Sequence, residues 1–225
     1  MDLLAELVAL VAPPVCGGCR RVLIDARSLI CAECRRRLPW LRGACERCGL
    51  LEHRGRRCPA IGSALERTWA PLAYAGVARD LMTALKFRGR LPLAGPMAAQ
   101  MAANLPDELR LAGATVVAVP AHAGRRRRRG HDPAAALATQ LAARAGMPMA
   151  RCLERTDSSA NQVGANRVTR LSGDRLSVRA TVGVPARVLL VDDVHTTGAT
   201  LETCAIALRG AGAGWVAGVA YARAL

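Results

Sequence analysis

The feature that most restricts the fold is the segment at residues 188–201, which reads VLLVDDVHTTGATL. Its first four residues are apolar and rich in valine and leucine, which is typical of a strand buried on both faces. Small and hydroxyl-bearing residues follow, and an alanine-rich stretch with helical spacing comes next. A strand that leads through a tight turn into a helix predicts an α/β fold, with a parallel sheet covered by helices.

From about Trp69 onward, apolar runs alternate with alanine-rich amphipathic stretches, and no internal repeat is present. Strands are expected at residues 115–119, 187–191 and 215–222, and helices at residues 76–87, 93–105, 133–145 and 199–210. Asp132 and Pro133 form a start signal for the third helix. A basic loop is expected at residues 122–130 and a long mobile loop at residues 154–174. This alternation again predicts a mainly parallel sheet flanked by helices.

Cysteine usage marks a small head before this domain. Seven of the nine cysteines lie between Cys16 and Cys58, and the first four form two Cys-x2-Cys pairs: Cys16, Cys19, Cys31 and Cys34. In a chain without a secretion signal, this spacing indicates zinc rather than disulfides, because two such pairs place four thiolates around one tetrahedral ion. The prediction is an N-terminal helix and zinc-binding head over residues 1–66, and an α/β domain over residues 67–225.

A second cluster follows, formed by Cys45, Cys48, His53 and Cys58. Its spacing is that of a zinc knuckle, a small module that can bind single-stranded nucleic acid. The aromatic side chain on which such modules stack a base is missing, and no partner cysteine follows Cys58. Two interpretations therefore stay open: a second zinc site with His53 as a ligand, or a loop in which His53 is an exposed residue.

The charge of the chain is strongly positive. The net charge is +15, and 31 of the 32 basic residues are arginines. Such a balance favours phosphate-rich partners, such as nucleotides, nucleic acid or an anionic membrane surface. The excess of alanine and arginine is also what a genome-wide composition bias produces, so a nucleic-acid surface stays one of two open interpretations.

No targeting segment or membrane span is expected. Residues 3–12 are apolar, but Asp2 and Glu6 interrupt the stretch and it is too short to cross a bilayer. A short amphipathic helix packed on the protein is expected there, in a soluble cytoplasmic protein.

The chemistry concentrates where the strand of residues 187–191 ends. Asp192 and Asp193 can accept hydrogen bonds from the vicinal hydroxyls of a ribose. The next turn offers backbone amides and the positive end of a helix, which together bind a phosphate. This turn, called the phosphate loop from here on, consists of Thr196, Thr197, Gly198, Ala199 and Thr200. The sequence therefore predicts a ribose 5-phosphate site.

The segment VLLVDDVHTTGATL resembles the motif with which type I phosphoribosyltransferases bind phosphoribosyl pyrophosphate (PRPP). The whole chain, with its cysteine-rich head, resembles the competence protein F (ComF) family. Further matches are LKFRG at residues 85–89, the Val119-Pro120 turn, the Arg129-Gly130 pair, and the polar residues at 161–167. The resemblance implies a type I phosphoribosyltransferase-like fold and a phosphoribosyl ligand with Mg²⁺. It also implies a role in DNA uptake, with the DNA-uptake machinery and single strands entering the cytoplasm as partners.

The chain departs from the family at several positions. Members commonly read Arg-Gly-Phe-Asn-Gln where this chain has Arg-Gly-His-Asp-Pro at residues 129–133, and Ile61 stands where many carry an eighth cysteine. Thr196 stands where purine phosphoribosyltransferases place an aspartate base, which disfavours a 6-oxopurine acceptor. The chain starts Met1-Asp2, without the N-terminal cysteine of a glutamine amidotransferase.

Basic side chains are expected to bind the pyrophosphate, which a transferase would displace from C1 of PRPP with a nitrogen nucleophile. The candidates are Lys86, Arg125, Arg126, Arg127, Arg128, Arg129 and Arg167. Lys86 is the single lysine of the chain and lies beside the single phenylalanine, whereas the arginine run is alternatively a solvated surface. Two functions stay open: a DNA-uptake protein that binds single-stranded DNA, and a phosphoribosyltransferase of nucleotide metabolism with an unidentified nitrogen acceptor. The sequence identifies no catalytic residue.

Overall fold

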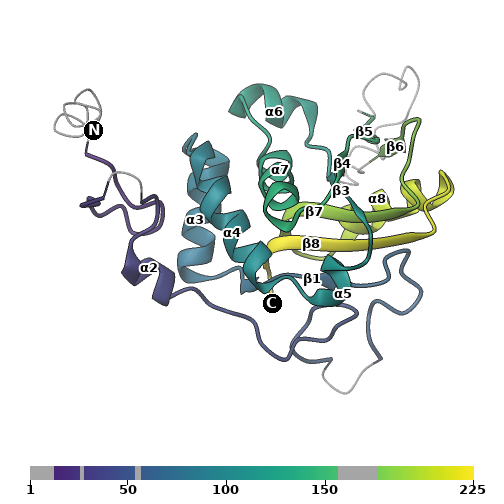
Figure 1. Cartoon of the computed structure of the whole chain (residues 1–225), viewed down its shortest axis with the longest axis horizontal. Helices are drawn as coiled ribbons and strands as arrows, with labels where there is room; N and C mark the ends of the chain where they lie inside the picture. The colour runs from purple at the N-terminus through teal and green to yellow at the C-terminus, as the bar shows by residue number, and fades with distance from the viewer. Residues whose placement is uncertain (1–12, 26–27, 54–56, 157–176) are drawn as a thin grey trace, which may run out of the picture.

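A parallel β-sheet forms the centre of the protein (Figure 1). The computed structural model describes residues 13–25, 28–53, 57–156 and 177–225. Over these residues the sheet has six strands in the order β1-β8-β7-β3-β4, with β2 also paired to β8, and every pairing is parallel. The strands are β1 (Thr68–Trp69), β2 (Leu72–Ala73), β3 (Thr115–Ala118), β4 (Met149–Ala150), β7 (Arg187–His195) and β8 (Trp215–Arg223). The predicted α/β class is confirmed.

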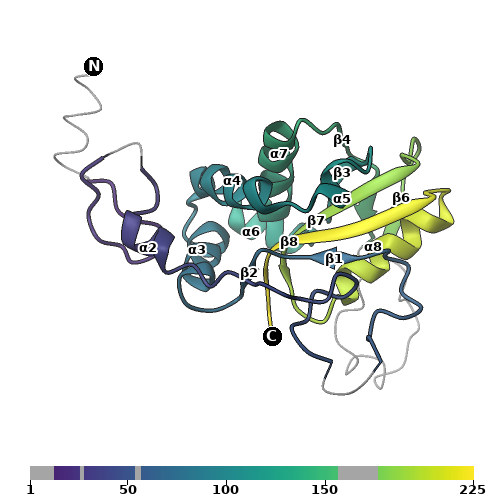
Figure 2. The same ribbon diagram turned by 60° about the horizontal axis from the view of Figure 1, so that its bottom comes forward.

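Helices cover both faces of this sheet (Figures 1 and 2). The helices α3 (Gly76–Phe87), α4 (Ala94–Asn104) and α7 (Pro133–Ala145) pack on one face, and α8 (Ala199–Gly210) packs on the other. Asp132 caps α7, as predicted, because its Oδ1 accepts a hydrogen bond from the amide of Ala135 at 3.1 Å. Shorter elements are α2 (Ala32–Arg36), η1 (Leu91–Leu93), α5 (Asp107–Arg110) and α6 (Ala123–Arg129).

The central strand β7 is buried on both faces. Its side chains alternate, so that Val188 and Leu190 pack toward α8 while Leu189 and Val191 pack toward α3, α4 and α7. The predicted end of this strand at residue 191 is wrong. The strand continues to His195, because β8 supplies a parallel partner as far as the His195–Arg223 pair.

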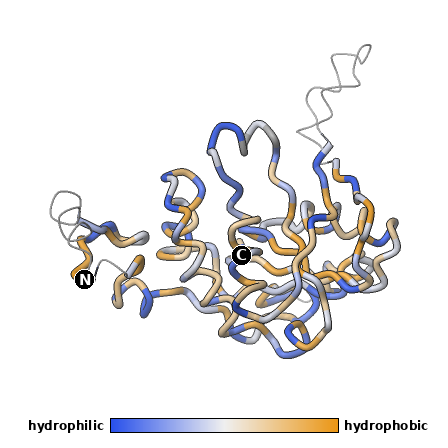
Figure 3. Tube along the Cα trace, turned by 45° about the horizontal axis from the view of Figure 1, so that its top comes forward, coloured by the Kyte–Doolittle hydropathy of each residue, from blue (hydrophilic) through white to orange (hydrophobic). Residues whose placement is uncertain are grey.

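The basic loop expected at residues 122–130 is also wrong, because residues 123–129 form the helix α6. Contacts with α3 anchor its end: Nε2 of His131 lies 2.7 Å from the carbonyl oxygen of Leu85, and the guanidinium of Arg129 lies 4.6 Å from the centre of the Phe87 ring. Figure 3 shows the hydrophilic, arginine-bearing end of α6 in blue at the top of the molecule. Tertiary contacts therefore stabilise a helix where the charge pattern alone indicated a loop.

The expected loop at residues 154–174 begins as a strand. β5 (Leu153–Arg155) pairs in antiparallel fashion with β6 (Val178–Ala180), and Glu154 forms an ion pair with Arg179 at 2.7 Å. Leu153 and Val178 also pack against the apolar cluster beneath α8, which explains the pairing. Residues 157–176, with the pyrophosphate candidate Arg167, lie outside the described residues, as does the helix expected at residues 3–12.

The first part of the cysteine-rich head shares the main apolar core. Cys16, Ile30 and Cys34 are buried in the same cluster as α3 and α4. A Cβ atom on Gly17 would lie within 3 Å of the Leu93 side chain, so the backbone of the head approaches η1 closely and needs glycine there. The head is therefore packed on the domain that follows it.

Candidate functional site

A cleft of about 310 Å³ lies at the carboxyl edge of the parallel sheet, where ligands collect in α/β proteins. Residues from β7, from the segment after β3 and from the ends of α3, α6 and α7 line it. Its polar or charged side chains are Tyr74, Lys86, His122, Arg129, Asp132, Arg155, Asp192, Asp193, Thr196 and Thr200. Both carboxylates of the Asp192-Asp193 pair are thus in this cleft, together with the first and last residues of the phosphate loop.

Asp192 and Asp193 project to opposite faces of β7, because successive side chains of a strand alternate. Oδ1 of Asp193 lies 2.7 Å from Nζ of Lys86 in α3, and each of these two side chains is 17% exposed. Asp192 faces α8 instead, where Cys204 lies. Burial, and then the nearby charge of Asp192, raise the pKa of the Cys204 thiol to about 12. The strand therefore presents one carboxylate paired with a cation and one without a cation partner among the described residues.

The environment of Asp192 disfavours the ionised form of its carboxyl group. Burial, and then the charge of Asp193, raise the pKa of Asp192 from its ordinary value to about 7, although Lys86 opposes the shift. Hydrogen-bond donors or a cation entering the cleft would stabilise the ionised form. Such a shift in a cleft is typical of a functional site rather than of a structural residue.

The raised pKa of Asp192 predicts a specific pH dependence of stability. The folded state holds the proton of this carboxyl group up to about pH 7, whereas the unfolded state releases it near its ordinary pKa of 3.8, so stability decreases as the pH rises through this window. Asp192→Asn removes this cost. Thermal unfolding should therefore show a larger rise in Tm for the variant at about pH 8 than at about pH 5.

The matched control is Asp80→Asn, which changes an exposed aspartate of α3 far along the helix from Lys86. Its effect on Tm should be small and the same at both pH values. An Asp192→Asn shift that is also equal at both pH values would show that burial does not perturb this carboxyl group.

The phosphate loop joins β7 to α8 through Gly198. This residue has φ 82° and forms the N-cap of α8, and a Cβ atom on it would lie 2.7 Å from Nε2 of His195. Glycine is therefore required on both conformational and steric grounds. The first-turn amides of a helix have no partner within the helix, which makes this end a suitable place for an anion. In α8 the amide of Ala199 donates to Oγ1 of Thr197 at 3.4 Å.

The loop separates two cavities. Thr196 and Thr200 line the cleft of the aspartate pair, whereas Thr197, Gly198 and Ala199 line a second cavity of about 400 Å³. The five residues predicted for phosphate binding are thus contiguous in space, but only two of their side chains reach the first cleft.

The candidate cations separate into two groups. Lys86 and Arg129 line the cleft, and Nε of Arg129 is buried without a hydrogen-bond partner in the described part of the chain. Arg127 and Arg128 are exposed on α6. The side chains of Arg125 and Arg126 are not among those described. The run of five arginines is therefore not uniform, because Arg129 lines the cleft whereas Arg127 and Arg128 are solvated.

Several residues of the two cavities were missed in the sequence. Tyr74 and Arg155 of the first cleft carry no local pattern that marks them, whereas His122 lies in the basic segment predicted to bind pyrophosphate. In the second cavity, His195 and Arg223 are only 5% and 6% exposed, and Nη1 of Arg223 lies 3.0 Å from Nε2 of His195. Burial, and then the charge of Arg223, lower the pKa of His195 to about 4, so the neutral ring accepts the hydrogen bond. The one sequence signal that could have identified this pair is the position of Arg223 at the end of the last expected strand, which pairs in parallel with β7.

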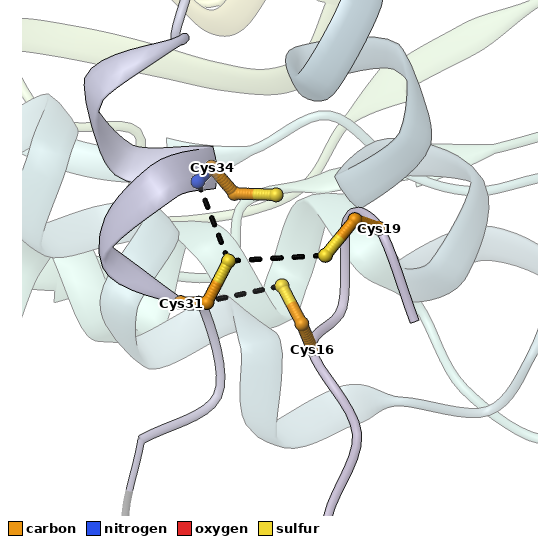
Figure 4. A group of neighbouring side chains, drawn as sticks. All are labelled: Cys16, Cys19, Cys31 and Cys34. Atoms are coloured by element: carbon orange, nitrogen blue, oxygen red, sulfur yellow. Dashed lines mark hydrogen bonds between the residues drawn. The ribbon is translucent and has the colours of Figure 1, made fainter. Parts of the chain in front are cut away.

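The first cysteine cluster has the geometry of a zinc site (Figure 4). The four sulfur atoms of Cys16, Cys19, Cys31 and Cys34 lie within 4.8 Å of one another, and those of Cys19 and Cys31 are 3.8 Å apart. Four thiolates at about 2.3 Å from one ion form a tetrahedron with edges of about 3.8 Å. The residues present therefore fit a tetrahedral zinc ion.

Backbone amides support the thiolate form in this cluster. The amide of Cys31 donates to Sγ of Cys16 at 3.3 Å, and the amide of Cys34 donates to Sγ of Cys31 at 3.4 Å. Burial raises the pKa of Cys16, but hydrogen bonds from the amides of Cys31, Cys19 and Gly18 outweigh this effect. The net result is a pKa lowered to about 6. Thiolate is the form that binds zinc.

The second cluster includes His53. Ligand atoms of Cys45, Cys48, His53 and Cys58 also lie within 4.8 Å of one another, and Sγ of Cys48 is 3.1 Å from Nε2 of His53. Ile61, at the position where a further cysteine was expected, is 58% exposed. His53 thus takes the fourth place in the cluster, and three sulfur atoms and one imidazole nitrogen are also a donor set that zinc accepts.

Comparisons with known proteins agree with the two clusters. Residues 7–62 match the double zinc ribbon domain family, and both clusters lie within this match. No curated protein matches the chain. Among solved structures, the purine phosphoribosyltransferase from Pyrococcus horikoshii Ot3 is similar at 19% sequence identity and a TM-score of 0.37, over 56% of this chain and 72% of that one.

The described residues contain no helix that is both long and apolar enough to cross a membrane. The chain thus joins a zinc-binding head of the double-ribbon type to a parallel α/β domain with a charged cleft at the carboxyl edge of its sheet.

Proposed function

We propose that this is a ComF-type protein with a type I phosphoribosyltransferase-like site that binds PRPP. The observation that carries the proposal is the cleft itself, in which the Asp192-Asp193 pair, two threonines of the phosphate loop and the cations Lys86, Arg129 and Arg155 line one volume of about 310 Å³. Each part of PRPP has a chemically matching group there. Calorimetric titration with PRPP and Mg²⁺ tests it.

The ribose and its 5-phosphate match the groups on β7 and the loop that follows. The carboxylates of Asp192 and Asp193 accept hydrogen bonds from the two ribose hydroxyls, which relieves the unfavourable burial of Asp192. The loop amides and the N-terminus of α8 bind the 5-phosphate, with the hydroxyls of Thr196 and Thr200 as further donors.

The pyrophosphate matches two of these cations. Lys86 offers a compact ammonium group next to Asp193, and Arg129 offers a guanidinium that lines the cleft. Pyrophosphate oxygens are suitable acceptors for both groups. Oxygen donors from PRPP and the aspartates fit Mg²⁺, which would neutralise the pyrophosphate charge when bound.

In the cell, we propose that the protein acts in DNA uptake and binds single-stranded DNA on its basic surface. The exposed Arg127 and Arg128 on α6 support this, because they lie beside the cleft without contributing to its lining. The alternative is a phosphoribosyltransferase of nucleotide metabolism. Lys86 and Arg129 favour it, since they suit a pyrophosphate leaving group displaced from C1 by a nitrogen nucleophile.

We also propose that each ribbon binds one zinc ion, with His53 as the fourth ligand of the second, and that the head extends over residues 1–66 of the chain. Freshly purified protein should then contain two zinc ions per chain. Cys31→Ser should reduce this to one and lower the Tm, because Cys16 and Cys34 of the same cluster are buried in the main core.

Metal analysis and thermal unfolding measure these two effects together. Cys204→Ser is the control, since Cys204 is a buried residue of α8 that lies in neither cluster, and this variant should keep two zinc ions. Protein with reduced thiols and no zinc would contradict the assignment.

A further inference from the structure

The second ribbon, formed by Cys45, Cys48, His53 and Cys58, contacts the sheet next to the phosphate loop. The amide of Thr68 in β1 donates to the carbonyl oxygen of Arg47 at 2.9 Å. A Cβ atom on Gly49 would lie 3.3 Å from the carbonyl oxygen of Thr68 and 3.7 Å from the Arg223 side chain. Cys48, Arg223 and the loop residues 197–199 line one cavity of about 400 Å³. Residues of the second ribbon and of the phosphate loop therefore line the same cavity.

Arg223 is a buried cation, with an exposed fraction of 6%. Among the described residues, its Nε has no hydrogen-bond partner and no carboxylate forms an ion pair with it. Burial lowers the pKa of Arg223, and the Cys48 and Cys45 thiolates oppose that shift. With zinc bound, three thiolates and one neutral imidazole carry a net charge of about −1. The second cluster would thus supply negative charge beside Arg223, which lines the same cavity as Cys48 and lies 3.7 Å from the Cβ position of Gly49.

His195 transmits this contact to the loop. Nη1 of Arg223 contacts both nitrogens of the His195 ring, Nδ1 at 2.5 Å and Nε2 at 3.0 Å, and Nε2 lies 2.7 Å from the Cβ position of Gly198. The carbonyl oxygen of His195 also accepts from the amide of Ala224 at 2.9 Å, which fixes the backbone beneath the ring. The imidazole thus fills the space under the phosphate loop.

We infer that the second zinc ribbon positions the phosphate loop through Arg223 and His195. Zinc in this ribbon holds Arg223 in place, Arg223 holds the ring of His195, and the ring supports Gly198 in its left-handed conformation. The expected effect on phosphate affinity rests on the proposed function, whereas the expected effect on the order of the loop does not.

The first ribbon is an internal control for this inference. Its residues Cys16 and Gly17 pack against Leu81 of α3 and Leu93 of η1, and it contributes no residue to the cavity behind the loop. Loss of zinc from the first ribbon should therefore disturb α3 and leave the loop unchanged, although both ribbons belong to the same head.

The experiment compares Cys58→Ser, which disrupts the second cluster, with Cys31→Ser, which disrupts the first, using metal analysis to verify the loss of one zinc ion from each. Hydrogen exchange of the amides at residues 196–203 is measured without ligand, and PRPP affinity is measured by calorimetry. Cys58→Ser should accelerate loop exchange and weaken PRPP binding, each about tenfold, whereas Cys31→Ser should leave loop exchange within about twofold of wild type.

Arg223→Gln is the second variant, which keeps both clusters and so stays informative if Cys58→Ser fails to fold. It should retain two zinc ions and accelerate loop exchange as Cys58→Ser does, and the double variant should add little, because both changes break one chain of contacts. Wild-type loop exchange in Arg223→Gln, or equal acceleration by Cys31→Ser, would overturn the inference. Failure of the wild type to bind PRPP would instead reject the proposed ligand and leave the exchange result to decide the positioning role.

Discussion

Replacing Asp192 and Asp193 together with alanine should weaken PRPP binding at least about a hundredfold and leave the fold intact. Each carboxylate contributes a charge-assisted hydrogen bond to a ribose hydroxyl, and such bonds contribute about 1.5–3 kcal/mol each. The fold should tolerate the change, because Asp192 is held at an unfavourably raised pKa and both side chains line a cleft rather than the apolar core. Calorimetry with PRPP and Mg²⁺ measures the affinity, and thermal unfolding measures the fold.

Asp80→Ala is the matched control for this double variant, since it removes an exposed aspartate of the same helix that carries Lys86. It should bind PRPP as the wild type does. A double alanine variant that keeps wild-type affinity would show that the carboxylates do not contact the ligand, and an unfolded double variant would show that their role is structural.

Substitutions in the arginine run should separate two kinds of ligand. Arg129→Gln should weaken PRPP binding about tenfold or more, because it removes a guanidinium that lines the cleft, and should hardly change the binding of single-stranded DNA. The double variant of Arg127→Ser and Arg128→Ser should do the reverse. It should weaken DNA binding and lower the salt slope of its affinity by about 1–2, since fewer counterions are released.

The measurement is a fluorescence titration with a labelled single strand at several salt concentrations, alongside PRPP calorimetry on the same variants. Each arginine variant serves as the control of the other. Unchanged DNA affinity in the double serine variant would identify the outer arginines as a solvated surface, and unchanged PRPP affinity in Arg129→Gln would remove this residue from the pyrophosphate site.

Local sequence patterns predicted those helices whose bounds are set by residues within the helix or next to it. The helices Gly76–Phe87, Pro133–Ala145 and Ala199–Gly210 have the bounds that their apolar spacing and caps indicated. The end of β7 was missed because it depends on the partner strand β8, and α6 was missed because its anchoring contacts come from Leu85 and Phe87, about forty residues earlier in the chain.

The candidate site was predictable where it is contiguous in sequence. Asp192, Asp193 and the phosphate loop follow one another, so a single strand-turn-helix unit places them together. Lys86 was predicted from its place in the LKFRG segment and from its being the single lysine of the chain, and the structure places it 2.7 Å from Asp193. The pair of His195 and Arg223 had no such mark, because a buried contact between a neutral ring and a cation leaves no periodic pattern in the sequence.

The most direct test of the central claim is a calorimetric titration of the zinc-loaded wild-type protein with PRPP in the presence of Mg²⁺. The geometry of the cleft predicts one site per chain with a Kd below about 1 mM, and competition by ribose 5-phosphate, which shares the aspartate pair and the phosphate loop. Protein that retains its zinc and its cooperative unfolding but shows no binding of PRPP at millimolar concentration would contradict the account.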